Sequence, residues 1–238
     1  PARPRGAGVA ILGEDRVVVL YGAYELLRLQ GWRWYAPGPA GEVAPEPAAA
    51  LRLPEVPIEG RPSYELYRGF DSAYASQESA ELLVWMARNR MNLASHRPLT
   101  GGLGRKLGML YKNGGHIFEP ILDPDRVAPS GRTLWEEHPE WYGLPASGER
   151  RKERALATQF CVSQPDLLAY LSEELVRTIR GPWREADLVA VWGFDTWGSS
   201  CTCPRCRSLA NDTDQMLHLL AALRCGIDEA RARGEIAH

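Results

Sequence analysis

Three cysteines stand close together near the end of the chain, at a spacing that suits a metal ion. Cys201, Cys203 and Cys206 belong to the segment CTCPRC, which can fold into one tight turn with its sulfurs directed to one point. Thiolates bind Zn²⁺ tetrahedrally at about 2.3 Å, and a structural zinc site takes four ligands. Cys161, which stands just before a predicted helix, is the best candidate for the fourth. The spacing therefore predicts a structural Zn²⁺ site.

The sequence leaves other interpretations of the cysteines open. The five thiols could form a disulfide and leave the others free, although five are too few for a disulfide scaffold in a chain of 238 residues. A catalytic thiol is a further alternative, but no adjacent histidine is evident as its base. Cys225, inside the last predicted helix, is expected to face the core, which makes it a weaker candidate for the fourth ligand.

A second set of candidate residues lies at the predicted strands. In parallel α/β folds, functional side chains gather where strands end and helices begin. The rule selects carboxylates, histidines, an amide and two tryptophans: Asp71, Asn92, His96, His116, Glu119, Trp192, Asp195 and Trp197. Carboxylates beside aromatic platforms are typical of carbohydrate sites, and a carboxylate pair can do acid–base work on a glycosidic bond.

These residues also have structural interpretations. Asp71 or Asp195 could cap the helix that follows its strand. His116, after two glycines, could be a hydrogen-bonded structural histidine, and Trp192 could belong to the core. Trp197 stands in a loop rich in glycine and serine, where burial in the core is less expected.

Alternating strands and helices are predicted to position these side chains. The proline- and glycine-rich segment 37–62 marks a boundary between domains. After it we predict strands at 64–70, 91–95, 116–121 and 187–194, helices at 79–89, 104–111, 165–180 and 213–233, and a long polar connection at 123–158. The helix at 165–180 has the clearest apolar period, with Pro165 in its first turn and Ser163 as its cap.

The alternation predicts parallel strands with crossover helices. Before the boundary we predict a strand at 16–20, a helix at 22–30 and a strand at 32–35, too little to bury a core without further strands upstream. Residues 1–60 are therefore interpreted as the end of a small N-terminal α/β domain with its linker. A closed (β/α)₈ barrel needs eight units and about 250 residues. The four units in 61–238 thus predict the first half of a TIM-like barrel, whose remainder is missing from this chain.

The composition excludes several classes of protein. Hydrophobic residues make up 45% of the chain and charged residues 24%, values that suit a globular protein rather than a disordered one. The 28 basic and 30 acidic side chains nearly cancel, so no basic excess indicates a nucleic-acid or anionic-membrane partner. No apolar run approaches the roughly 20 residues of a membrane-spanning helix. No signal peptide is evident in the sequence, which begins at Pro1.

Short motifs in a fixed order resemble those of bacterial glycoside hydrolases. YGAYELL, GWRWYAPG and GEVAP, which begin at Tyr21, Gly31 and Gly41, look like the end of the N-terminal domain of alpha-glucuronidase-like hydrolases. The later segments RGF, WMARNRMN, GHIF, HPEWYG, QFCVSQP and CTCPRC recur in the same order in a related bacterial family. That family carries a conserved domain of unknown function and is similar to alpha-glucuronidases and beta-hexosaminidases.

This resemblance implies an N-terminal α/β domain, a (β/α)₈ barrel, and an oligosaccharide or polysaccharide as the partner. The family has a cysteine at the position of Cys161, which supports a four-thiolate site. An acid at the end of the fourth strand protonates the leaving oxygen in the related hydrolases, and Asp195 takes that role by analogy. The chain departs from the family pattern here, because Phe194 replaces a frequent asparagine and the loop from Asp195 to Cys201 is one residue longer.

The leading hypothesis is therefore a glycoside hydrolase acting on glycans; the sequence leaves the sugar open, and glycans that contain uronic acids or amino sugars are among the candidates. Asp195 would be its general acid, and sugar would be bound by Asp71, Asn92, His96, His116, Trp192 and Trp197. One alternative is a non-catalytic glycan-binding barrel in which zinc merely holds a loop. Another is a zinc-stapled interaction module without a sugar site.

Overall fold

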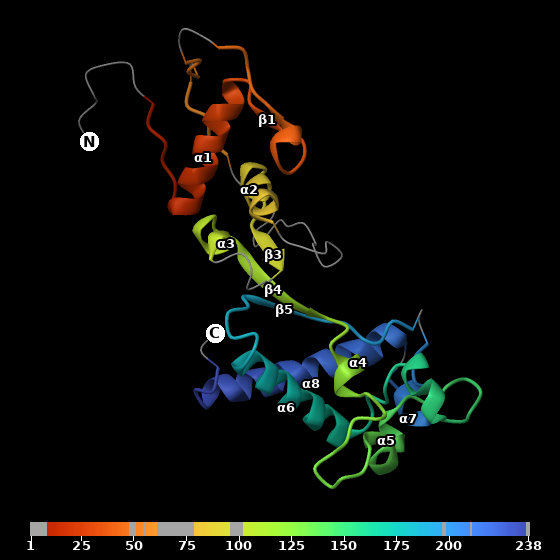
Figure 1. Ribbon diagram of the computed structural model, residues 1–238. Helices are drawn as coiled ribbons and strands as arrows, with labels where there is room; N and C mark the ends of the chain where they lie inside the picture. Colours follow the sequence, from red (N-terminus) through yellow and green to blue (C-terminus); the bar gives the residue numbers. More distant parts are fainter. Residues whose placement is uncertain are drawn as a thin grey trace. The chain divides into compact units, whose positions relative to one another are not determined.

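A computed structural model of the chain describes residues 9–47, 51–54, 56–60, 79–95, 102–196, 199–209 and 211–236. The predicted strand 64–70 lies outside these residues. The chain divides into two compact units, Pro1–Lys112 and Asn113–His238, each described by itself below. Helices are mixed with a small parallel sheet (Figure 1), so the prediction of an α/β protein is confirmed at that level.

The first unit begins with a helix where the sequence predicted a strand. Helix α1 spans Arg16–Leu29, and the Asp15 carboxylate caps it by accepting the N–H groups of Val17 and Val18 at 2.7 and 2.8 Å. The predicted strand at 16–20 is therefore wrong. The cap satisfies two N–H groups at the helix start, which outweighs the modest preference of valine for strands.

The rest of this unit follows the prediction more closely. Strand β1 (Arg33–Trp34) pairs antiparallel with β2 (Glu42–Val43) across the short turn η1 (Pro39–Gly41). Helix α2 (Ala80–Arg88) is capped by Ser79 and buries its apolar face. The predicted strand 32–35 and helix 79–89 are thus confirmed.

Strand β3 (Leu93–Ser95) confirms the predicted strand 91–95 and runs parallel to β4 (Leu110–Gly115), with Leu93 opposite Leu110. The helix predicted at 104–111 is only one turn, α3 (Leu103–Lys106). Gly108, at φ +81°, separates this turn from β4.

Strand β4 continues into the second unit, where β5 (Leu188–Val191) lies beside it and completes the order β3-β4-β5. The strand predicted at 116–121 is wrong, because β4 ends at Gly115 and residues Phe118–Ile121 form the helical turn α4. The glycine pair belongs to the strand instead of preceding it. A Cβ at Gly114 would collide with the carbonyl oxygen of Ala190, so only glycine permits this approach of the backbones.

Two long helices build the core of the second unit. Helix α6 (Pro165–Arg180), at its predicted bounds, packs against α8 (Asp212–Ala232) (Figure 1). The fully buried side chains between them and around them include Leu167, Leu171, Leu175, Leu219 and Leu223. Two expectations are wrong here: Gln164 rather than Ser163 is the N-cap of α6, and Cys225 is exposed rather than in the core.

The polar connection between β4 and α6 contains short helical turns, as predicted. They are α5 (Leu134–Glu137), η3 (Pro139–Trp141) and η4 (Lys152–Ala157). Aromatic side chains of this connection are buried in the same core as α6, notably Phe118, Tyr142 and Phe160. Among the residues that the structure describes, no helix is both long and apolar enough to cross a membrane.

The start of α8 offers a stability test. Asn211 and Asp214 form a capping box, in which the Asn211 side chain accepts the Asp214 N–H at 3.1 Å. We expect Asn211→Ala to lower the free energy of unfolding by about 1 kcal/mol, measured by urea denaturation. Asn211→Asp keeps the acceptor and should unfold like the unsubstituted protein. Equal stability of the alanine variant would show that the cap contributes nothing.

Candidate functional site

The four predicted metal ligands come together in the second unit. The sulfurs of Cys161, Cys201, Cys203 and Cys206 all lie within 4.8 Å of one another. Cys161 Sγ is 3.6 Å from Cys203 Sγ and 3.7 Å from Cys206 Sγ. In a regular tetrahedron with Zn–S bonds of about 2.3 Å, the sulfurs are about 3.8 Å apart. All four are free thiols, so the cluster has the geometry of a metal site rather than of a disulfide.

Backbone N–H groups point at the sulfurs of this four-cysteine cluster. Leu144 donates to Cys201 Sγ at 3.3 Å, and the Cys206 N–H donates to Cys203 Sγ at 3.4 Å. Cys203 also caps the short helix α7 (Pro204–Arg207). Donors directed at sulfur favour the thiolate, which is the form that binds metal.

Hydrogen bonds between the thiols shift the pKa values of the cysteines in opposite directions. Hydrogen bonds from the thiols of Cys161 and Cys206, with help from the Leu144 N–H, lower the pKa of Cys201 to about 3. The neighbouring sulfurs of Cys161 and Cys201 raise the pKa of Cys206. A proton is thus retained where sulfurs crowd together. A dication at the centre would take its place, because it neutralises several thiolates at once.

The cluster joins three segments of the second unit. The Cys161 N–H donates to the carbonyl of Trp141 at 2.7 Å, and the Thr202 N–H donates to the carbonyl of Leu144 at 2.8 Å. Gly143 lies so close to Gln159 that a Cβ would collide with the Gln159 carbonyl oxygen. The cysteines therefore connect the start of α6, the connection before it and the loop before α7.

A second group of predicted residues meets at the ends of β4 and β5. His116 Nδ1 lies 2.6 Å from the carbonyl oxygen of Gly193, and its ring meets Trp192 edge-on with centroids 5.1 Å apart. The Asp195 N–H donates to Glu119 Oε1 at 3.2 Å. The structure therefore brings His116, Glu119, Trp192 and Asp195 into one neighbourhood, called the strand-end group below.

The structural interpretations hold for some members of this group and fail for others. Trp192 is 39% exposed, so it is not a core residue. Asp195 is exposed and caps no described helix, since the next helix in the chain, α7, is capped by Cys203. His116 does make the hydrogen bond expected of a structural histidine. Glu119 lies in the turn α4 rather than in a strand.

Sequence reasoning missed Gln159, which holds the strand-end loop. Its side-chain oxygen accepts the Phe194 N–H at 2.9 Å, while its amide donates to the Phe194 carbonyl at 2.6 Å and to Thr196 Oγ1 at 2.9 Å. Gly193 leaves room for this amide, because a Cβ there would collide with Gln159 Oε1. The only sequence signal was the position of Gln159 two residues before Cys161.

The structure does not place the other predicted sugar-binding residues in the strand-end group. Asp71, His96 and Trp197 lie outside the described residues. Asn92 belongs to the first unit, where its carbonyl accepts the Leu110 N–H at 2.6 Å and helps to start the pairing of β3 with β4.

Together these features define an α/β protein with a four-cysteine cluster able to hold a metal ion. The profile of one family, described as Domain of unknown function (DUF4838), matches residues 36–222. This span is most of the chain, so the chain belongs to that family. No curated protein and no solved structure matches it.

Proposed function

We propose that this protein acts on carbohydrate, as a glycoside hydrolase. The observation that supports this most is the hydrogen bond that the Asp195 N–H donates to the Glu119 carboxylate, in the same loop region as the exposed Trp192. A carboxylic acid can protonate a glycosidic oxygen, and an exposed indole can stack against a sugar ring. We further propose that the sheet is the first half of a (β/α)₈ barrel.

Each member of the strand-end group has a proposed role. Asp195 is the general acid that gives its proton to the leaving oxygen. Glu119 positions Asp195 through the backbone N–H that it accepts. His116 forms a hydrogen bond with the Gly193 carbonyl through Nδ1. No described residue hydrogen-bonds its Nε2, and we assign this nitrogen to a sugar hydroxyl. Asp71, Asn92, His96 and Trp197 are further proposed sugar contacts, on the basis of their positions at the predicted strand ends.

We propose that the four-cysteine cluster binds one structural Zn²⁺. The sulfur spacing and the N–H donors support this assignment. Four thiolates leave no open coordination position, so the ion would not activate water. Its role would be to fix the loop that joins the strand-end group to α7.

Hydrolysis assays test the proposed function directly. The protein would be incubated with aryl glycosides and with oligosaccharides containing uronic acids or amino sugars, and also applied to a glycan array. Release of the aryl group or a shortened oligosaccharide supports the hydrolase. Array binding without turnover favours the glycan-binding barrel. Absence of both, with loss of folding on chelation, favours the zinc-stapled interaction module.

A further inference from the structure

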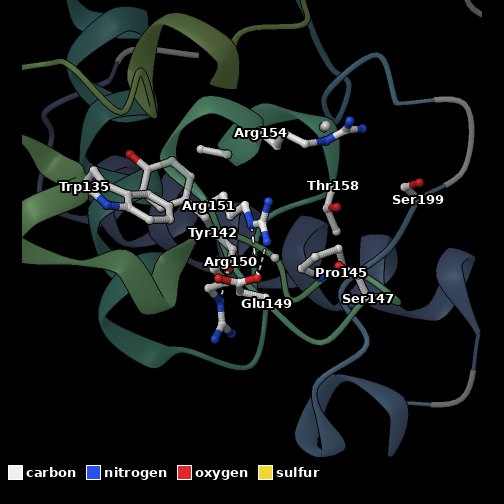
Figure 2. A pocket seen from close by; sticks show the side chains of 13 residues that line it. Trp135, Tyr142, Pro145, Ser147, Glu149, Arg150, Arg151, Arg154, Thr158 and Ser199 are labelled. Atoms are coloured by element: carbon white, nitrogen blue, oxygen red, sulfur yellow. Dashed lines mark hydrogen bonds and ion pairs between the residues drawn. The ribbon is translucent and has the colours of Figure 1, made fainter.

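A pocket of about 460 Å³ opens in the second unit, and none of the strand-end residues lines it. Its walls come from α5, the segment after η3, η4 and the loop before the CTCPRC segment. Aromatic and charged side chains line it, among them Trp135, Tyr142, Glu149, Arg150, Arg151 and Arg154 (Figure 2). The volume falls within the roughly 300–1,000 Å³ of small-molecule sites.

The pocket carries more positive than negative charge. Three guanidinium groups line it against one carboxylate, that of Glu149, which pairs with Arg151 at 2.6 and 3.0 Å. The Arg150 Nε–H donates to the carbonyl of Tyr142 at 2.6 Å, which fixes the side chain. The two terminal nitrogens of Arg150 remain able to bind a ligand. The Arg154 side chain makes no hydrogen bond or ion pair with any residue that the structure describes. Figure 2 shows Arg154 reaching out apart from the Arg151–Glu149 pair.

Among the described residues, no carboxylate pairs with Arg150 or Arg154, so two positive charges are uncompensated in this part of the chain. A guanidinium presents paired N–H donors that match the two oxygens of a carboxylate or a sulfate. A ligand with one such group would neutralise the excess charge.

An aromatic wall adds a second element of recognition. The rings of Trp135 and Tyr142 are 5.2 Å apart and inclined at 46°. Tyr142 is buried and fixed, whereas Trp135 is partly exposed where it lines the pocket. A partly exposed indole beside cationic groups suits a ligand that has an apolar face as well as an anionic group.

We infer that this pocket binds an acidic saccharide, a sugar ring that carries a carboxylate or a sulfate. The oxyanion part of the inference rests on the arginines, and the sugar part also rests on the proposed function. The Thr202 side chain supports the pocket wall, because its hydroxyl Oγ1 donates to the carbonyl oxygens of Leu144 and Pro145 at 2.9 and 3.1 Å. The pocket therefore gives the chain a second contact with its glycan, outside the strand-end group.

Titrations followed by NMR test this inference without requiring turnover. The ¹⁵N-labelled protein is titrated separately with glucuronic acid, galactose 6-sulfate, glucose and inorganic sulfate, while the indole N–H resonances are recorded. We expect both acidic sugars to bind and to shift the Trp135 resonance, with a Kd that rises with salt. Glucose should bind at least about tenfold more weakly, because it lacks the charged hydrogen bonds.

Charge-removing variants locate the binding. Arg154→Gln should raise the Kd for both acidic sugars about tenfold, and Arg150→Gln with Arg154→Gln should raise it further. Arg154→Gln alone leaves the Arg150–Tyr142 hydrogen bond in place, so it reports on binding even if the double variant misfolds. Arg184→Gln, an exposed arginine that does not line the pocket, is the matched control and should bind like the unsubstituted protein.

Several results would overturn the inference. Unchanged affinity in Arg154→Gln, or equal binding of glucose, would exclude a role for the arginines. If inorganic sulfate binds as tightly as galactose 6-sulfate, the pocket recognises only the oxyanion and not the sugar ring. Hydrolysis of neutral glycosides without any binding of acidic sugars would overturn the pocket and leave the proposed hydrolase standing. Binding of acidic sugars without turnover in any assay would support the pocket and count against the hydrolase.

Discussion

The protein purified without added metal is expected to contain one equivalent of zinc, and a chelator should unfold much of its second unit. Three of the four ligands, Cys161, Cys201 and Cys206, are buried in the same core as α6 and α8, so their separation would open that core. Structural zinc contributes an apparent free energy of about 10–16 kcal/mol in zinc-finger peptides. Metal analysis together with thermal unfolding, with and without chelator, measures both effects.

Single serine substitutions sharpen this prediction. Cys161→Ser and Cys201→Ser should each lower the zinc content and the unfolding temperature. Cys225→Ser removes an exposed thiol of α8 outside the cluster and should change neither, which makes it the matched control. Less than about half an equivalent of metal, with no more than about three free thiols after denaturation, would exclude the zinc site. Stability that depends on reductant rather than on chelator would indicate a disulfide.

Asp195→Asn is expected to reduce hydrolysis about 10²–10⁴-fold while the fold stays intact, because general acid catalysis is typically worth that much. The side chain is exposed, and the hydrogen bond that fixes this residue uses its backbone N–H, which asparagine keeps. Turnover of the substrate identified by the aryl glycoside and oligosaccharide assays provides the measurement. Thermal unfolding of the variant verifies that the loss is not one of stability.

Two further variants complete that experiment. Glu173→Gln removes an exposed carboxylate on α6, outside the strand-end group, and should leave turnover unchanged. Glu119→Gln keeps an oxygen that can accept the Asp195 N–H, so a smaller loss is expected than for Asp195→Asn. Near-normal turnover of Asp195→Asn would rule out Asp195 as the general acid.

The four-cysteine cluster was predictable because most of it is local in the sequence. Three cysteines within one turn must lie close together in any fold, and the helix start after Cys161 placed the fourth thiol with few assumptions. The bounds of α6 were equally accessible, since Pro165 marks its first turn and Gly181 its end. Such features depend on short spacings, which distant parts of the chain do not change.

Apart from the strand predicted at 16–20, which the local cap by Asp15 overturns, the errors arose where long-range contacts decide the structure. The glycines before His116 suggested a strand start, but they end β4 because Gly114 must pass close to Ala190, far along the chain. Gln159 stands in the QFCVSQP segment, but the sequence did not indicate its role, which depends on the distant residues Phe194 and Thr196. The arginine pocket likewise combines residues whose side chains have no common period in the sequence.

The wide separation of the cysteines along the chain also affects the order in which the protein can fold. Cys161 and Cys203 are 42 residues apart, so closing that loop costs about 3 kcal/mol of chain entropy before any bond to metal compensates for it. At about 5–20 residues per second, the ribosome makes Cys203 roughly 2–8 s after Cys161. During that interval the first cysteine has no partners from the CTCPRC segment. Completion of the cluster therefore waits for synthesis of the CTCPRC segment, and under the proposed zinc assignment we expect the supply of zinc from that moment on to govern the yield of folded protein.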